Sequence, residues 1–289
     1  MNVPRIGSFC SGIGGLDLAV AAHYNASHAW FCEYDSAPSK VLDHHWPDTL
    51  NHGDLTSTDW TAAEPVDIVT AGYPCQPFST AGQRKGTEDE RHIWPAIRNA
   101  ISVLRPRVVV LENVRGHLSL GFDSVLGDLA GLGFDAEWGT FRSSDIGAPH
   151  RRERLYVVAT VTDAPSEPRP ERRIWTPVRG TRRRCGVEIE PRATVDEKRW
   201  GSYSAAIRRW QPIIGRLAPD PMDDKGRLNP ELTEWMMGYP AGWVTDPAIG
   251  LSWAQQLKAC GNAVQPQTAA LALDVLSERL AATDQTIDA

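Results

Sequence analysis

The sequence predicts an α/β fold with a doubly wound, mostly parallel sheet and a small inserted domain. Short apolar runs alternate with helical stretches over the first 160 residues, which is typical of strands covered by helices on both faces. A region rich in Pro, Arg and Gly then interrupts this pattern, and helical periodicity resumes after it. A chain of 289 residues is long enough for one large core with a small appended module.

The predicted strands are mostly apolar along their whole length, as expected for buried strands of a parallel sheet. They span residues 5–10, 28–33, 66–72, 107–114 and 154–161. Helical periodicity appears between them, in LDLAVAAHY, APSKVLDHHW, WPAIRNAISVL and SVLGDLAGLG. Ligands of such sheets bind at the carboxyl ends of the strands, so polar residues at these ends are the first candidates for a functional site.

The region after the last predicted strand shows no period longer than a few residues. Between Pro165 and Arg216 it holds thirteen Lys or Arg against six Asp or Glu, although the whole chain carries a net charge of −6. Basic side chains drive binding to phosphates, so we expect a small nucleic-acid-binding module here, with disorder as the alternative. The predicted domains are a main domain at residues 1–162, the module at 163–228, and helices at 229–289 that complete the main domain.

Five cysteines are scattered along the chain without a C-x-x-C pair, which argues against a disulfide framework and a zinc site. No apolar run approaches the roughly 20 residues of a membrane helix, and the N-terminal sequence lacks the features of a signal peptide. We therefore expect a cytoplasmic protein that binds no metal ion and does not associate with a membrane.

The glycine-rich turn CSGIGG joins the first predicted strand to the first predicted helix. Glycines let a ligand approach the backbone, and a helix N-terminus offers free N–H groups. Glu33 ends the second predicted strand, where a carboxylate can accept both ribose hydroxyls. Asp54 in HGDLT lies between the second and third predicted strands, where it can accept from an adenine amino group. Together they predict a pocket for an adenosine-type ligand; for the turn alone, a tight connection without a ligand is the alternative.

Cys75 lies between Pro74 and Pro77 in AGYPCQPFSTAG, directly after a predicted strand. The prolines restrict this loop, so we expect the thiol to face the ligand crevice rather than the core. It becomes a nucleophile when nearby positive charge or a helix N-terminus lowers its pKa. A lone cysteine is more often a small buried hydrophobic residue, which is the role expected for the other four.

Glu112 and Asn113 end a strongly apolar predicted strand, and Arg152 and Arg154 enter the last one two positions apart. A carboxylate at the end of a parallel strand favours a site residue over a misplaced surface residue. Residues two apart on a strand share one face, where two guanidinium groups suit a phosphate or a carboxylate. A solvated basic edge is the alternative for the arginines.

In this order and at these separations, the motifs resemble those of the cytosine carbon-5 DNA methyltransferases of bacteria and their phages. After the glycine-rich turn, the matching blocks are FCEYD, GDLT, GYPCQPFSTAGQRKG, LENVRG, APHRRERLYVVA, NPELTEWMMGYP and GNAVQPQ. They cover nearly all of the chain except residues 165–226, where the family has its target-recognition module. The resemblance implies a Rossmann-like methyltransferase fold, S-adenosylmethionine as methyl donor and double-stranded DNA as substrate.

The resemblance also implies roles for single residues. Cys75 would add to carbon 6 of cytosine, and Glu112 would hold and transiently protonate ring nitrogen 3. Arg154 would contact the base carbonyl beside its partner Arg152, and Asn113 would fix the loop that carries the cysteine. The implied cofactor residues are Cys10, Gly12, Ile13, Gly15, Glu33, Tyr34, Asp54, Leu55, Pro74, Ile93 and Asn262. The implied DNA contacts, in a loop that extrudes the base from the duplex, are Gln76, Ser79, Gln83 and Arg84.

Two positions depart from the family pattern. Cys10 replaces a phenylalanine at one wall of the adenine pocket, and His150 stands where glutamine is common. We expect a monomeric DNA (cytosine-5-)-methyltransferase in the cytoplasm of a bacterial host, with a role in restriction–modification or in phage DNA protection. An RNA methyltransferase with the same thiolate chemistry and a DNA-binding protein that has lost catalysis are the alternatives. No clear Cys-Phe-Thr element of the RNA enzymes follows the arginine pair, and a pure binding protein has no use for Cys75.

Overall fold

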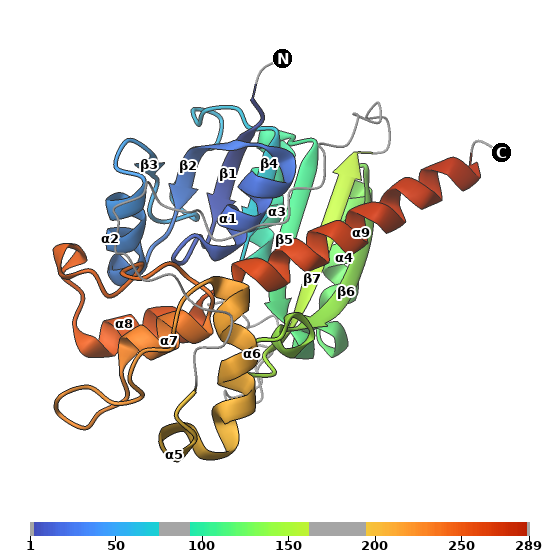
Figure 1. Ribbon diagram of the computed structural model, residues 1–289. Coiled ribbons are helices and arrows are strands. Elements are labelled where there is room, and N and C mark those ends of the chain that lie inside the picture. The colour runs from blue at the N-terminus through green and yellow to red at the C-terminus, as the bar shows by residue number, and fades with distance from the viewer. Residues whose placement is uncertain (1–2, 75–92, 162–194, 288–289) are drawn as a thin grey trace.

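Figure 1 shows the computed structural model, which describes residues 3–74, 93–161 and 195–287. Within these residues, seven strands form one sheet in the order β3-β2-β1-β4-β5-β7-β6. Neighbouring strands from β3 to β5 are parallel, whereas β7 runs antiparallel to both β5 and β6. The predicted fold class is therefore confirmed. The strands are β1 (Arg5–Phe9), β2 (Ser27–Cys32), β3 (Leu50–Asn51), β4 (Ile68–Ala71), β5 (Val108–Val114), β6 (Phe134–Arg142) and β7 (Glu153–Val161).

Helices cover both faces of this sheet (Figure 1). α1 and α9 pack on one face, in a core that contains Val110, and α3 and α4 pack on the other, in a core that contains Val109. These two neighbours in β5 lie in different cores because successive strand residues point to opposite faces. The helices are α1 (Gly15–Tyr24), α2 (Ser36–His45), α3 (Trp94–Leu104), α4 (Phe122–Gly131), α5 (Glu197–Trp200), α6 (Ser204–Ile214), α7 (Pro230–Met236), α8 (Trp253–Asn262) and α9 (Pro266–Ile287).

The long C-terminal helix α9 is amphipathic and lies within the helical region predicted at residues 229–289. Ala269, Ala272, Leu273 and Leu276 are buried, and their spacing is that of one helix face. This face packs across β7 and β6 (Figure 1). Among the described residues, neither α9 nor any other helix combines the length and the apolar character needed to cross a membrane.

The structure corrects the sequence prediction at several elements. β7 lies between β5 and the edge strand β6 and runs antiparallel to both, an arrangement that the sequence does not predict. Most residues of β6 remain partly exposed, so its sequence lacks a continuous apolar run. α6 lies in the region expected to have no helical period, yet Ile207, Trp210 and Ile214 are buried at helical spacing. The polar helix α8 falls within the helical region predicted at residues 229–289, but its polar sequence gives no separate signal for it.

The start of α1 packs against the C-terminal part of the chain without room for a side chain. A Cβ on Gly15 would overlap the Val264 carbonyl oxygen and the Tyr239 hydroxyl oxygen. That hydroxyl donates a hydrogen bond to the same carbonyl at 2.6 Å. Glycine at this position therefore allows three segments to meet.

Replacing Gly15 with alanine is expected to lower the free energy of unfolding by about 1–3 kcal/mol, because the added methyl group overpacks this contact. Gly127→Ala in α4 is the matched control, since a Cβ there meets no atom within 4 Å. Alanine favours a helix interior over glycine by about 1 kcal/mol, so the control should be neutral or more stable than the wild type. Denaturant unfolding measures both variants, and an equal response would contradict the packing argument.

Candidate active site

Glu112 is a buried carboxylate at the carboxyl end of β5. Its Oε1 lies 3.1 Å from Nε of Arg154, which β7 presents beside it. The residue is only 8% exposed, and this burial raises the pKa of the Glu112 carboxyl against the opposing charges of Arg154 and Arg152. The structure therefore places the sequence-predicted carboxylate in contact with Arg154 and within electrostatic reach of Arg152.

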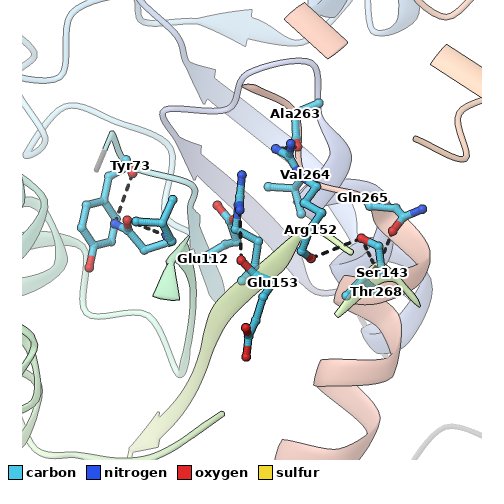
Figure 2. Close-up of polar contacts among 12 residues, drawn as sticks. Tyr73, Glu112, Ser143, Arg152, Glu153, Ala263, Val264, Gln265 and Thr268 are labelled. Carbon is cyan, nitrogen blue, oxygen red and sulfur yellow. Dashed lines mark hydrogen bonds and ion pairs between the residues drawn. The ribbon is translucent and has the colours of Figure 1, made fainter. Parts of the chain in front are cut away.

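Arg152 joins this trio to the C-terminal part of the chain. Its guanidinium donates hydrogen bonds to the carbonyl oxygens of Gly261 at 2.9 Å and Ala263 at 2.6 Å, and Figure 2 shows the side chain reaching toward Ala263. Its Nε is buried and has no hydrogen-bond partner among the described residues. Arg152 therefore fixes the segment after α8 relative to Glu112.

Asn113 holds the end of β4 in place. Its Nδ2 donates to the Tyr73 carbonyl oxygen at 3.3 Å. The Tyr73 hydroxyl donates in turn to Nε2 of His117 at 2.8 Å, because Nδ1 of His117 lies 2.9 Å from the Leu120 carbonyl and carries the ring proton. The residue before Pro74 is thus anchored through both its backbone and its ring.

The predicted nucleophile lies outside the described residues. The same holds for all four predicted DNA contacts and for one further cysteine. These residues are Cys75, Gln76, Ser79, Gln83, Arg84 and Cys185.

The glycine-rich turn contacts Glu33 through its backbone. The Gly12 N–H donates to Oε2 of Glu33 at 2.7 Å, and the Asp35 N–H donates to Oε1 at 2.8 Å. Burial raises the pKa of the Glu33 carboxyl. Gly12 has a positive φ of 55°, and a Cβ on it would meet no atom within 4 Å. The turn therefore leaves open space beside a carboxylate that still has lone pairs to offer.

A cavity opens between this turn and helix α8. Three of the predicted cofactor residues, Gly12, Ile13 and Asn262, line it. Other residues that line it were not predicted from the sequence, and the polar ones among them are Asp35, Gln255 and Lys258. Gln255, Lys258 and Asn262 are three and four positions apart, which places them on one face of a helix. This spacing is the signal that would have found the α8 residues.

Other predicted cofactor residues do not line this cavity. Tyr34 is 82% exposed, and Pro74 is exposed as well. Oδ1 of Asp54 accepts hydrogen bonds from the hydroxyl and the N–H of Thr56 at 2.7 and 2.8 Å, and these lower the pKa of the Asp54 carboxyl. Leu55 is buried in the core that also contains α3, and Ile93 packs against that core.

The free cysteines within the described residues are buried or partly buried. Cys32 and Cys260 are buried, as expected, and Cys10 is partly buried. Desolvation raises the pKa of the Cys10 thiol. No group of three or more His, Cys, Asp or Glu side chains in the described part of the chain could hold a metal ion.

The chain is similar in sequence to known DNA methyltransferases. A model of the family described as C-5 cytosine-specific DNA methylase matches residues 5–182, more than half of the chain. The type II methyltransferase M.NlaIV of Neisseria lactamica is 30% identical over 145 residues, which are 46% of this chain and 34% of that relative. A DNA N-6-adenine-methyltransferase of Escherichia phage P1 is 40% identical over 140 residues, 44% of this chain and 18% of that relative. The match thus spans about a third and a fifth of these two relatives.

The fold is shared with solved structures. The Dnmt2 methyltransferase of S. pombe superposes with a TM-score of 0.64 at 15% identity, and the match covers 96% of this chain and 99% of that protein. At this identity the likeness establishes the fold.

Proposed function

The chain belongs to the C-5 cytosine-specific DNA methylase family, and we propose that it transfers a methyl group to carbon 5 of cytosine in duplex DNA. The observation that carries this proposal is the buried Glu112 carboxyl beside Arg154 at the end of β5. A carboxyl whose pKa is raised by burial, beside fixed positive charge, suits a ring that must be held at nitrogen 3 and polarised at its carbonyl.

In the proposed reaction, the Cys75 thiolate adds to carbon 6 of the base, and the electron pair of the 5,6 double bond makes carbon 5 nucleophilic. Glu112 donates a hydrogen bond and then a proton to ring nitrogen 3, while Arg154 and Arg152 stabilise charge on the base. Carbon 5 would then bond to the methyl group that S-adenosylmethionine supplies, with S-adenosylhomocysteine as the leaving group. Water would take the carbon-5 proton, ring nitrogen 3 would return its proton to Glu112, and Cys75 would leave carbon 6 as a thiolate, which restores the 5,6 double bond. The anchor of Tyr73 by Asn113 supports this role, because it fixes the chain one residue before Pro74.

The cavity residues fit S-adenosylmethionine, which would supply an electrophilic methyl group. Gly12 leaves space for a ligand, and Glu33 beside it retains acceptor capacity for ribose hydroxyls. Tyr34 offers an exposed aromatic face for an adenine ring. Ile13 and Asn262 would complete the walls, with Asp54, Leu55 and Ile93 toward the adenine end.

The DNA substrate requires base extrusion, at a cost of a few kcal/mol. The loop with Gln76, Ser79, Gln83 and Arg84 is proposed to meet the duplex, and the basic module at residues 163–228 to read its sequence. The name of the phage P1 relative refers to adenine, but the match covers 18% of that protein, so this name assigns no target base here. A role in restriction–modification or phage DNA protection, and a monomeric state in the cytoplasm, remain predictions.

The proposed activity is tested by expression in a methylation-deficient bacterium, followed by sequencing of its genome for 5-methylcytosine. We expect the mark at one short sequence, and we expect a Cys75→Ser variant to abolish it while it still binds S-adenosylmethionine. Soluble, folded protein together with an unmarked genome would contradict the assignment. Marked RNA with unmarked DNA would instead favour the RNA methyltransferase.

A further inference from the structure

The two walls of the cavity are joined by an ion pair at its rim. One wall consists of the glycine-rich turn and the start of α2, and the other is α8. Nζ of Lys258 in α8 lies 2.6 Å from Oδ2 of Asp35, the N-cap residue of α2. These two residues, here called the rim pair, are 223 positions apart in the sequence.

The rim pair carries the charges of the cavity. Among the described residues that line it, Asp35 is the acidic one and Lys258 the basic one, and the others are apolar or carry neutral polar groups. A cavity that presents one carboxylate and one ammonium complements a ligand with one ammonium and one carboxylate. The α-amino-acid end of S-adenosylmethionine and of its product S-adenosylhomocysteine is such a zwitterion.

The pair is exchangeable because it is exposed and is not needed to hold the walls together. The Lys258 and Asp35 side chains are 63% and 40% exposed, and ion pairs in such positions contribute little to stability. Beneath them, Ala37 and Val41 of α2 and Ala259 of α8 belong to one buried apolar cluster. The walls therefore stay packed when the rim pair opens.

We propose that the rim pair binds the amino-acid end of the nucleoside ligand, with Lys258 taking the α-carboxylate and Asp35 the α-ammonium group. This inference rests on the proposed function, because that function supplies a ligand with such an end. In the free protein the two side chains satisfy each other, and a bound zwitterion replaces each partner with a group of the same charge. The pair thereby selects for the complete amino-acid end over truncated nucleosides.

The test measures dissociation constants by calorimetry for three nucleosides. These are S-adenosylhomocysteine, its decarboxylated analogue S-adenosyl-3-thiopropylamine, and 5′-methylthioadenosine, which lacks the amino-acid end. Lys258→Met should raise the dissociation constant of S-adenosylhomocysteine by about fivefold and leave the dissociation constants of the other two ligands unchanged. Asp35→Asn, which keeps the helix cap, should weaken both ammonium-bearing ligands and leave 5′-methylthioadenosine unchanged.

The control is Arg208→Met, which removes another exposed ion pair, with Glu197 at 3.1 Å, away from the cavity. It should change none of the three dissociation constants. Equal weakening of all three ligands by Lys258→Met would overturn the inference, because the pair would then only support the wall. Unchanged binding of S-adenosylhomocysteine to both rim variants would also overturn it. A wild-type protein that binds none of the three would instead reject the proposed function, and the inference with it.

Discussion

Replacing Glu112 with glutamine is expected to lower the methylation rate by about 100-fold or more, which is the scale of general acid–base catalysis. Glutamine keeps the size and one acceptor oxygen, but it has no proton to give to ring nitrogen 3. In the wild type, the Glu112 carboxylate lies 3.1 Å from Nε of Arg154. The neutral glutamine loses this buried ion pair and keeps only a weaker hydrogen bond to Arg154. Cofactor affinity should stay unchanged, because Glu112 does not line the cavity described above.

Single-turnover methylation of an oligonucleotide that carries the target site measures this loss without interference from product release. Glu153→Gln is the matched control: Glu153 lies next to Arg154 in β7, but it pairs at 3.6 Å with the exposed Arg115 and Arg142. Exposed pairs are weak, so the control should retain a rate within about threefold of the wild type. Similar losses in both variants would indicate that the arginine strand, and not the proton of Glu112, limits the reaction.

The pH dependence of the methylation rate distinguishes the loss of the Glu112 proton from a change in the shape of the side chain. Burial raises the pKa of Glu112, so the carboxyl keeps its proton at a higher pH than an ordinary glutamate. As the pH rises through this raised pKa, the carboxyl ionises and the wild-type rate should fall. Ionisation of Cys75 acts in the opposite direction, because more thiolate forms as the pH rises. The alkaline fall should therefore be absent in Glu112→Gln, while the rise from the thiolate remains.

The central sheet was predictable because its strands are buried on both faces. The strand predicted at residues 107–114 has an apolar run at 108–111 and matches β5 within one residue. The chemistry at its end follows from the rule that parallel sheets bind ligands at strand ends. An edge strand gives no such signal. Buried and exposed positions do not alternate regularly along β6. Its antiparallel pairing with β7 depends on tertiary packing, which the local sequence does not encode.

The site was predictable where both residues of a contact belong to recognisable motifs at strand ends. Glu112 and Arg154 meet because two neighbouring strands place them together. The rim pair was not predictable, because it depends on how α8 docks beside α2. The sequence of α8 is polar, and only Ala259 and Cys260 of this helix are buried. α6 contains Pro212, a residue that normally ends a helix. The apolar face of α6 is buried by packing against α7 and the segment near Ala148, and this packing cannot be read from the sequence of α6 alone.

Replacing Glu234 with leucine is expected to lower the free energy of unfolding by about 3 kcal/mol or more, since each buried hydrogen-bonding group left without a partner costs about 1–3 kcal/mol. The Glu234 side chain is 1% exposed. Its carboxylate accepts from the backbone N–H groups of Gly242 at 2.9 Å, Val244 at 2.8 Å and Thr245 at 3.2 Å, and from the Thr245 hydroxyl at 3.1 Å. Leucine fills the space but accepts none of these bonds.

The control is Glu231→Gln, on the same helix α7 but exposed. It removes a charge near the helix N-terminus, which is worth about 0.3–1 kcal/mol. Denaturant unfolding of the two variants, with circular dichroism to confirm the folded baseline, measures the contrast. A Glu234→Leu variant as stable as the control would indicate that water reaches the three N–H groups and replaces the carboxylate.

The loss at Glu234 should also reach the cofactor cavity, because the loop it holds touches the glycine-rich turn. Trp243 lies between Gly242 and Val244, and its indole Nε1 donates to the Ile13 carbonyl oxygen at 3.0 Å. Ile13 lines the cavity, so a loop that loses its three anchors releases one wall of the site. Affinity for S-adenosylhomocysteine should therefore fall in Glu234→Leu under conditions where the protein is still folded. A folded variant with unchanged affinity would mean that the stacking of Trp243 on His45, with ring centroids 3.7 Å apart, holds the turn without the loop.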